Sequence, residues 1–533
     1  MTITDPTVAP RRPGAAAIPA ALSESFLASL TRLATATPDA ARTKTTAVYS
    51  GEDLAELPVA TPEAVAEAFG RARAAQSRWS ALPVSERAKV LLRFHDLVLE
   101  RQDEALDLMQ AENGKTRRDA FLEVMDIAIT ARYYANVAGG LLKPRRRRGA
   151  FPVFTRTTEL HHPKGVVTVI SPWNYPLSMA AGDAIPALMA GNAVVQKPDT
   201  QTALTALWAL KLMREAGLPA DAWQMVVGRG SSIGDALLQG ADYLMFTGST
   251  ASGRHIAAEA GKRLIGASLE LGGKNAMIVL PDADLDKTVQ GAIAAAFPSA
   301  GQLCVSIERM YVPDALLEEF SSRFAAATKQ LALGGAYDWS MDVGSLTTPS
   351  QLDTVTRHVE DAVAKGARVL AGGRPRPDLG PLFYEPTILT GVTPEMELHS
   401  GETFGPVVSL YGYDTVDEAV RMANGSPYGL NASVWGRDGA RARSVAARLH
   451  AGTVNVNEAF AAAWGSIDAP MGGMGDSGVG RRHGADGLLK YTEAQTIAQQ
   501  RLQGFTAPRG MAPESWARLL TRALKALKAL NNK

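Results

Sequence analysis

The stretch Tyr243-Leu-Met-Phe-Thr-Gly-Ser-Thr-Ala-Ser-Gly253 joins a short apolar run to an alanine-rich segment through a turn of small residues. The run at 243–246 predicts a buried strand, and the segment after the turn predicts a helix. Glycines at such a turn let the backbone approach a pyrophosphate group at the helix N-terminus, where free N–H groups favour anions. Ser249 replaces the middle glycine of the usual G-x-G-x-x-G pattern, so a simple packing turn is an equally good interpretation.

Similar apolar runs recur along the chain and alternate with alanine- and leucine-rich segments of helical length. They lie at 166–170, 193–195, 224–227 and 276–280. Strands that alternate with helices predict a parallel, doubly wound α/β sheet. A second α/β region is expected over 282–468, where further runs occur at 309–312, 407–410 and 453–456.

A helix is expected between Pro83 and Gly114. Ser85 can cap its N-terminus, and Gly114 is a plausible stop. One face of this helix carries the apolar residues Val90, Leu91, Phe94, Leu97 and Val98.

The length and charge of the chain limit its class. With 533 residues, the chain has room for about three or four structural units, or fewer large ones. Its 55 Lys and Arg residues and 54 Asp and Glu residues give a formal net charge of +1, so no global charge attracts nucleic acid. No apolar run reaches the roughly 20 residues that a membrane span requires. We therefore expect partners among small molecules or other proteins, with no nucleic acid and no membrane span.

Cys304 is the only cysteine of the chain. A lone thiol cannot form an intramolecular disulfide, which suits a reducing compartment, and we expect the cytoplasm. The residue is either a small buried hydrophobe, the commonest fate of a free cysteine, or a nucleophile with a base nearby. Glu270 lies between leucines upstream. If Glu270 is buried, its pKa rises into the range of a general base. The alternative is that Glu270 is a structural carboxylate that forms an ion pair at the end of a strand.

Two further polar residues occur in proline-bounded segments. Asn174 lies in Pro172-Trp-Asn-Tyr-Pro176, where two prolines restrain the loop, so its amide can donate a hydrogen bond to a developing oxyanion. In isolation, an asparagine that satisfies its own turn is the commoner case. Glu402, in Glu402-Thr-Phe-Gly-Pro406, is a candidate acceptor for sugar hydroxyls, although a single exposed glutamate is more often a solvated charge.

Together, these motifs resemble those of the aldehyde dehydrogenase superfamily over about residues 45–500. The remaining motifs of the set, in chain order, are Lys197-Pro198, Phe246–Gly253, Glu270–Lys274, Gly301–Cys304, Asn424–Leu430 and Pro470–Gly478. The resemblance implies an α/β protein with the aldehyde dehydrogenase fold. Such a fold combines a Rossmann-like parallel-sheet cofactor domain, a second α/β catalytic domain and a small β-hairpin element that joins subunits into homodimers or homotetramers.

The expected domain boundaries follow from the resemblance and from the composition of the two ends. They are a flexible N-terminal arm over 1–40, a cofactor-binding domain over 41–151 and 165–269, a catalytic domain over 270–484, oligomerisation strands over 152–164 and 485–503, and a C-terminal amphipathic helix extension over 504–533. Within the extension, leucines share one face of 514–528, and Arg518, Arg522, Lys525 and Lys528 lie largely on another. This helix could contact an anionic membrane surface or dock onto a neighbouring subunit.

The resemblance also implies catalytic roles. Cys304 is the nucleophile that attacks an aldehyde carbonyl, and Asn174 stabilises the oxyanion together with the backbone N–H of Cys304. Glu270 activates the water that hydrolyses the resulting thioester to a carboxylate. For a nicotinamide cofactor, Lys197 and Glu402 would hold the riboses, and the remaining contacts would come from Trp173, Gly248, Ser249, Gly253 and Phe404. No metal is expected.

Thr200 bears on the choice of cofactor. Members that prefer NAD usually carry a glutamate at this place, two residues after Pro198. Its absence removes repulsion against a 2′-phosphate, which Lys197 can attract. We therefore expect NADP, with NAD as the alternative because Asp199 restores a negative charge nearby.

The overall pattern is most similar to that of succinate-semialdehyde dehydrogenases of a divergent, second actinobacterial type, so succinate semialdehyde is the first substrate expected. Well-known members anchor the distal carboxylate with arginines, but Gly182 and Pro298 stand at the matching places. A buried carboxylate without a cation is costly. Since the loop 458–469 also carries Phe460 and Trp464, aromatic or aliphatic aldehydes are the alternative.

Two other functions are less favoured. An enzyme that transfers the acyl group to coenzyme A generally lacks the deacylating glutamate, whereas this chain has Glu270. A non-enzymatic scaffold is disfavoured because each expected catalytic residue is in place.

Overall fold

The computed structural model describes residues 17–151 and 154–530. Strand β8 (Tyr243–Thr247) lies inside a six-stranded sheet with the order β19-β9-β8-β5-β6-β7. Five of these strands are parallel, and β19 joins the edge antiparallel to β9. The other members are β5 (Val166–Ile170), β6 (Ala193–Lys197), β7 (Trp223–Met225), β9 (Gly266–Glu270) and β19 (Gly478–Val479).

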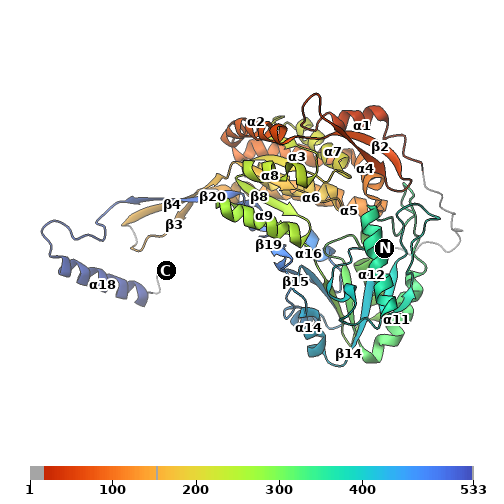
Figure 1. Ribbon diagram of the computed structural model, residues 1–533. Coiled ribbons are helices and arrows are strands. Elements are labelled where there is room, and N and C mark those ends of the chain that lie inside the picture. Colours follow the sequence, from red (N-terminus) through yellow and green to blue (C-terminus); the bar gives the residue numbers. More distant parts are fainter. Residues whose placement is uncertain (1–16, 152–153, 531–533) are drawn as a thin grey trace.

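Helices cover both faces of this sheet (Figure 1) because the strands are apolar on both sides. Val167 and Val169 belong to the core cluster that contains residues of α6 and α7, whereas Val166 and Val195 belong to the cluster of α2 and α8. The sheet and its helices, here called the first body, confirm the predicted doubly wound α/β arrangement. The helices are α2 (Pro62–Ala81), α5 (Arg117–Leu142), α6 (Pro176–Met189), α7 (Ala203–Glu215), α8 (Gly230–Gly240) and α9 (Thr250–Arg263).

A second body forms around a seven-stranded sheet with the order β12-β13-β14-β11-β10-β16-β17. Only β12 runs antiparallel to its neighbour. The strands are β10 (Asn275–Val279), β11 (Ile307–Pro313), β12 (Arg368–Ala371), β13 (Thr387–Thr390), β14 (Val407–Tyr413), β16 (Asn431–Trp435) and β17 (Thr453–Val456).

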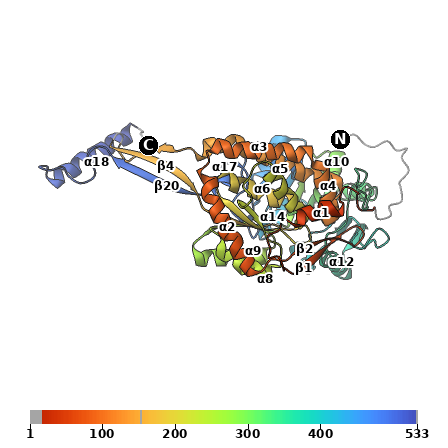
Figure 2. The same ribbon diagram turned by 90° about the horizontal axis from the view of Figure 1, so that it is seen from above.

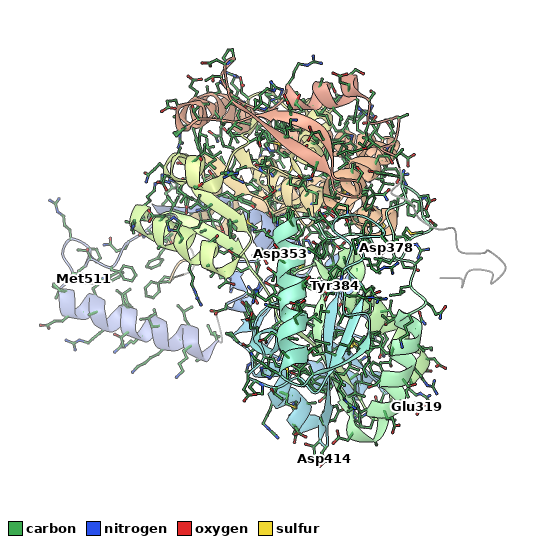
Figure 3. All side chains as sticks on the ribbon, turned by 45° about the vertical axis from the view of Figure 1, so that its right-hand side comes forward. Glu319, Asp353, Asp378, Tyr384, Asp414 and Met511 are labelled. Carbon is green, nitrogen blue, oxygen red and sulfur yellow. The ribbon has the colours of Figure 1, made fainter. Side chains whose placement is uncertain are left out.

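The helices of the second body pack on this sheet in two core clusters. They are α10 (Leu285–Ala296), α11 (Asp314–Thr328), α12 (Pro349–Ala364), α13 (Glu397–Ser400), α14 (Val416–Asn424) and α15 (Gly439–Ala446). Figure 3 shows α12 with the exposed Asp353 on the outside of this body. Shorter elements complete the region: the 3₁₀ helix η1 (Pro298–Gly301), α16 (Ala461–Gly465) and the paired strands β15 (Tyr428–Gly429) and β18 (Met474–Gly475). Helix α17 (Gly484–Leu489) packs instead on α5 and α6 of the first body.

A three-stranded antiparallel sheet extends away from both bodies (Figures 1 and 2). It contains β3 (Arg145–Arg147), β4 (Thr155–Pro163) and β20 (Thr492–Gln500), and beyond it lies α18 (Pro513–Ala529). The loop that carries Met511 and helix α18 both stand apart from the body (Figure 3). Trp516 holds the start of α18 to this loop, since its Nε1 donates a hydrogen bond to the Phe505 carbonyl at 2.9 Å. Among the described residues, no helix has both the length and the apolar character that crossing a membrane demands.

The prediction of a flexible arm over 1–40 is wrong for part of that range. Residues 24–31 form helix α1 (Glu24–Thr31), whose N-terminus is capped by the Ser23 side chain. Leu27 and Leu30 lie one turn apart and are buried in the core of the first body, so this segment gains the apolar contacts that keep it folded. Residues 1–16 lie outside the described residues. Next along the chain, β1 (Arg42–Ala47) pairs with β2 (Glu52–Pro58).

The helix expected between Pro83 and Gly114 is divided in two. Helix α3 (Val84–Glu100) ends at Arg101, whose φ of −117° breaks the helical geometry, and α4 (Gln102–Asn113) follows. The predicted cap at Ser85 is wrong, because the helix begins before it, after Pro83. Gly114 does end the second helix, with the left-handed φ of 84° that glycine adopts readily.

Candidate active site

A cavity of about 290 Å³ opens between the two bodies. Its walls come from the loop after β5, the turn after β8, the end of β9, the segment before β11 and the loop before β14, so the carboxyl ends of the first body's strands face the amino ends of β11 and β14 across it. We call it the central cavity. Of the predicted residues, it is lined by Trp173, Asn174, Gly248, Ser249, Glu270, Cys304, Glu402 and Phe404.

Cys304 is half-buried in the central cavity and follows the tight turn of η1. Ser299 and Ala300 have left-handed φ angles of 51° and 54°, and Gly301 has a φ of 71°. A Cβ atom at Gly301 would lie 2.0 Å from the Gly405 carbonyl oxygen, so only glycine fits this approach. Burial raises the pKa of the Cys304 thiol to about 12, and the nearby Glu270 carboxylate adds to the shift. The thiol is therefore protonated at neutral pH and needs a base before it can attack.

Asn174 lies beside the cysteine segment. Its Nδ2 donates a hydrogen bond to the Gln302 carbonyl at 3.0 Å, and an amide NH₂ group retains a second N–H for another acceptor. The backbone carbonyl oxygen of Asn174 accepts a hydrogen bond from Lys115 Nζ at 2.8 Å. The loop after β5 is thus tied both to the segment before Cys304 and to the junction of α4 and α5.

Lys115 forms an ion pair with Glu123 in which both side chains are fully buried. The second carboxylate oxygen of Glu123 accepts hydrogen bonds from the backbone N–H groups of Leu177 and Ser178, at 2.8 and 2.9 Å, in the first turn of α6. Burial lowers the pKa of Lys115 and raises the pKa of Glu123, and each partner opposes the shift of the other. We did not predict this pair, because no sequence motif connects 115–123 with the loop at 172–176.

Glu270 is the last residue of β9 and is paired in register with Thr247 on β8 and Gly478 on β19. Its side chain is buried, and its Oε1 has no hydrogen-bond partner. Burial raises the pKa of Glu270 to about 7, while Arg482 and Lys490 oppose the shift. A carboxylate with such a pKa exchanges its proton near neutral pH, as a general base must.

Glu402 and Phe404 belong to a loop that a buried ion pair holds in place. Glu402 Oε1 accepts a hydrogen bond from the Gly273 backbone N–H at 2.8 Å, and burial raises the pKa of Glu402 to about 8. Glu308 accepts the N–H of Phe404 at 2.9 Å and pairs with Lys274 at 2.5 Å. The Phe404 ring meets the Trp173 ring edge-on, with the centroids 5.6 Å apart.

A second cavity, of about 650 Å³, lies beside the first and is lined partly by the same residues of the loop after β5 and the turn after β8. We call it the side cavity. Lys197 and Asp199 at the end of β6 line it, together with the first turn of α9. The Ser249 hydroxyl caps this helix by accepting the N–H of Ser252 at 3.3 Å.

Two of the predicted cofactor residues line neither cavity. Thr200 is half-buried next to Asp199 and follows the last residue of this segment that lines the side cavity. At Gly253, an added Cβ would lie 2.5 Å from Leu271 Cδ2. The glycine therefore allows α9 to pack closely on the neighbouring segment, which is the packing interpretation of the glycine turn.

Apolar side chains dominate the part of the central cavity that lies away from the side cavity. They are Tyr175, Met179, Leu303 and Trp464. No lysine or arginine lines this cavity within the described part of the chain. Gly182 faces an acidic side chain, since a Cβ added there would lie 3.9 Å from Asp126 Oδ2. Within the same described residues, no group of three or more His, Cys, Asp or Glu side chains could hold a metal ion.

Replacing Lys115 with methionine should destabilise the protein by about 3–5 kcal/mol, because Glu123 would keep a buried charge without its partner. The measurement is thermal unfolding of Lys115→Met beside Lys89→Met, since Lys89 is exposed on α3 and a surface change costs at most about 0.5 kcal/mol. The double variant Lys115→Met/Glu123→Gln should recover part of the loss. Equal melting temperatures of the two single variants would contradict this expectation.

Comparisons with known proteins agree with this geometry. The model of the aldehyde dehydrogenase family matches residues 36–497. A "putative succinate-semialdehyde dehydrogenase [NADP(+)] 2" of Mycobacterium ulcerans is 54% identical over 483 residues, which cover 91% of this chain and 93% of that protein. A mitochondrial succinate-semialdehyde dehydrogenase of Oryza sativa is 36% identical, with 85% of each chain covered.

Solved structures are similar over nearly the whole fold. An aldehyde dehydrogenase of Brucella melitensis biovar abortus superposes with a TM-score of 0.83 at 34% identity, covering 88% of this chain and 96% of its own. Betaine aldehyde dehydrogenase of Staphylococcus aureus, in complex with NAD+, gives a TM-score of 0.83 at 29% identity and covers 91% and 99% of the two chains. The chain described here therefore belongs to the aldehyde dehydrogenase family of oxidoreductases.

Proposed function

We propose that this aldehyde dehydrogenase oxidises an aldehyde to its carboxylate with Cys304 as nucleophile, Asn174 as oxyanion donor and Glu270 as general base. The observation that supports the proposal most strongly is that all three residues line one cavity between the two bodies. A pKa of about 12 for the thiol and of about 7 for the carboxyl matches a nucleophile that needs a base and a base that works near neutral pH.

In the first half of the reaction, the Cys304 thiol gives up its proton to Glu270, which releases it to solvent, and Sγ bonds to the carbonyl carbon. The carbonyl π electrons move to oxygen, and this oxyanion accepts hydrogen bonds from Asn174 Nδ2 and the Cys304 backbone N–H. A nicotinamide cofactor, when bound, would supply the oxidising power by accepting a hydride from the substrate carbon, and a thioester on Cys304 would remain.

In the second half, Glu270 removes a proton from water, and the hydroxide oxygen adds to the thioester carbon. The carbon–sulfur bond then breaks, which releases the carboxylic acid, and the proton held by Glu270 passes to the Cys304 sulfur. The buried Glu270 Oε1 has no hydrogen-bond partner in the described structure, so an acceptor is available for the proton of this water.

The residues around the side cavity fit a dinucleotide. The N-terminus of α9 presents free backbone N–H groups to the cavity, as a pyrophosphate requires. Lys197 and Glu402 would hold the riboses, Ser249 and Trp173 the pyrophosphate region, and Phe404 the nicotinamide. We propose NADP as the preferred cofactor, supported by the NADP(+) in the names of the mycobacterial relatives. The lack of a carboxylate at Thr200, which lies next to the cavity-lining Asp199, agrees with this choice. NAD remains the alternative, since Asp199 lines the cavity and a related structure contains NAD+.

Succinate semialdehyde is the first candidate substrate, supported by the names of relatives that are 52–54% identical to this chain. The apolar lining of the central cavity favours a second candidate class, aldehydes with an uncharged aromatic or aliphatic tail. Initial rates with succinate semialdehyde, benzaldehyde and a medium-chain aldehyde, each with NAD and NADP, separate the two classes.

The proposal extends to the oligomeric state of the enzyme, its compartment and the contacts of its C-terminal helix. The projecting sheet leaves the residues of β20 after Thr492 exposed, and such an edge supports a homodimer or homotetramer. The absence of a second cysteine supports a reducing, cytoplasmic compartment. The basic amphipathic helix α18 supports docking onto a neighbouring subunit or contact with an anionic membrane surface.

The aldehyde-dependent rate should rise as the pH increases from about 6 to 8, because a raised pKa keeps Glu270 protonated, and so unable to act as a base, below about pH 7. Glu270→Gln should lose about 10²- to 10⁴-fold in rate and should lose this dependence on pH. The measurement is reduced-cofactor absorbance at saturating aldehyde across this pH range.

Cys304→Ala is the control, and it should bind cofactor but give no turnover with any aldehyde of the panel. Turnover by this variant at the parent rate would contradict the proposed reaction, and strict dependence of the parent rate on added coenzyme A would identify an acylating enzyme instead.

Thr200→Glu should raise the KM for NADP by about 10- to 100-fold, because the new carboxylate would repel the 2′-phosphate. The KM for NAD should fall or stay the same, since a carboxylate can accept ribose hydroxyls. Thr200→Gln, which has a similar size and no charge, is the matched control. An unchanged ratio of the two KM values in Thr200→Glu would show that this residue does not contact the cofactor.

A further inference from the structure

Trp464 forms part of the apolar wall of the central cavity. It lies on the five-residue helix α16 and is half-buried. Its ring packs against the Tyr175 ring, with centroids 5.7 Å apart, and against the Phe460 ring at 6.4 Å. Since Cys304 lines the same cavity, an aldehyde bound to its thiol would place its tail beside these rings.

The indole of Trp464 is fixed by Asp126. Trp464 Nε1 donates a hydrogen bond to Asp126 Oδ1 at 2.8 Å, across 338 residues of sequence. Asp126 is buried on the long helix α5, which packs against α3, α4 and α6. The backbone of α16 is held separately, because the N–H of Ala463 donates to Asn455 Oδ1 at 2.9 Å. The bond to Asp126 therefore sets the direction of the indole ring rather than the position of the helix.

Asp126 also places an acidic group behind this wall, in a small pocket that it lines together with Gly182, Asp183, Arg482 and Lys490. Asp126 lies next to Gly182, one of the two places where an arginine would hold the distal carboxylate of succinate semialdehyde. The nearby Arg482 is bound to Asp183 in a buried ion pair. A substrate carboxylate at this place would meet the acidic Asp126, and Asp183 already offsets the charge of Arg482. Arg482 keeps one donor, Nε, that has no partner among the described residues, but the net surroundings disfavour an anion.

We propose that Asp126 is a positioning residue that selects aldehydes with uncharged, apolar tails, by holding the Trp464 indole as a fixed wall of the substrate site. This inference rests on the proposed function, since it concerns the tail of the substrate that Cys304 attacks, and it favours the second of the two candidate substrate classes. Asn at this position keeps an acceptor for the indole N–H and removes the negative charge, whereas Ala removes both. The two variants therefore separate the contribution of the hydrogen bond from the contribution of the charge.

The test uses the purified full-length enzyme and its variants Asp126→Ala, Asp126→Asn and Trp464→Phe, with benzaldehyde, hexanal and succinate semialdehyde. Asp126→Ala should raise the KM for both uncharged aldehydes by about tenfold, as expected for the loss of one hydrogen bond to a charged acceptor, with kcat within about twofold. Asp126→Asn should leave these KM values within about twofold and should lower the KM for succinate semialdehyde.

A double-mutant cycle tests whether Asp126 acts through Trp464. In the Trp464→Phe background, which lacks the indole N–H, Asp126→Ala should cause no further change in KM. If Asp126→Ala does not fold, Asp126→Leu fills the same space without an acceptor and serves in its place.

Each other outcome contradicts the inference. An unchanged KM in Asp126→Ala would overturn it, and so would an equal effect of that change in the Trp464→Phe background. A wild-type preference for succinate semialdehyde over both uncharged aldehydes would overturn the proposed tail class. A folded wild-type enzyme that oxidises no aldehyde with either cofactor would refute the proposed function itself, and this outcome is distinct from an active enzyme that is insensitive to Asp126.

Discussion

The buried ion pair between Lys115 and Glu123 is the interaction on which the geometry of the site depends. Lys115 binds the Asn174 carbonyl, and Glu123 binds the first N–H groups of α6. Through these bonds one pair fixes the loop after β5 at both of its ends. Because Asn174 in turn binds the Gln302 carbonyl, the same pair determines where the oxyanion donor lies relative to Cys304.

Two other buried ion pairs surround the central cavity in a similar way. Lys274 with Glu308 holds the loop of Glu402 and Phe404, and Arg482 with Asp183 lies behind Glu270. The cations of these pairs are bound within the chain, so they stabilise loops instead of binding a substrate anion. The carboxyl groups that do line the cavity, Glu270 and Glu402, both have raised pKa values because they are buried. The same low-dielectric surroundings therefore raise the pKa of the buried base and favour an uncharged substrate tail against the apolar wall.

The sequence was sufficient to predict the α/β class and the residues that meet in the cavity. The strand–turn–helix pattern at 243–253 corresponds to β8 and α9, and Gly114 ends α4 as expected. Cys304, Glu270 and Asn174 could be selected because each lies in a local motif. Local patterns failed where tertiary contacts decide the outcome. The alanine- and proline-rich start suggested a flexible arm, yet Leu27 and Leu30 fold into the core.

The supporting residues could not be found from the sequence for a physical reason. Lys115, Glu123 and Asp126 lie on one face of the α4–α5 region, and nothing in their spacing indicates which distant loop they contact. Asp126 and Trp464 are separated by 338 residues, so only the packing of α5 against the second body brings them together. Gly253 is a residue with two interpretations, of which the structure supports close packing against Leu271, while its contact with a cofactor stays a prediction.

The central claim is that Cys304 carries an acyl group that Glu270 then helps to hydrolyse. The most direct measurement is the intact mass and peptide map of Glu270→Gln after reaction with an aldehyde substrate and oxidised cofactor. The account predicts a stable mass increase of one acyl group, located on the peptide that contains Cys304, and no such increase in a Cys304→Ala/Glu270→Gln double variant. An acyl group on any other residue, or Glu270→Gln turnover at the wild-type rate with no accumulated adduct, would contradict it.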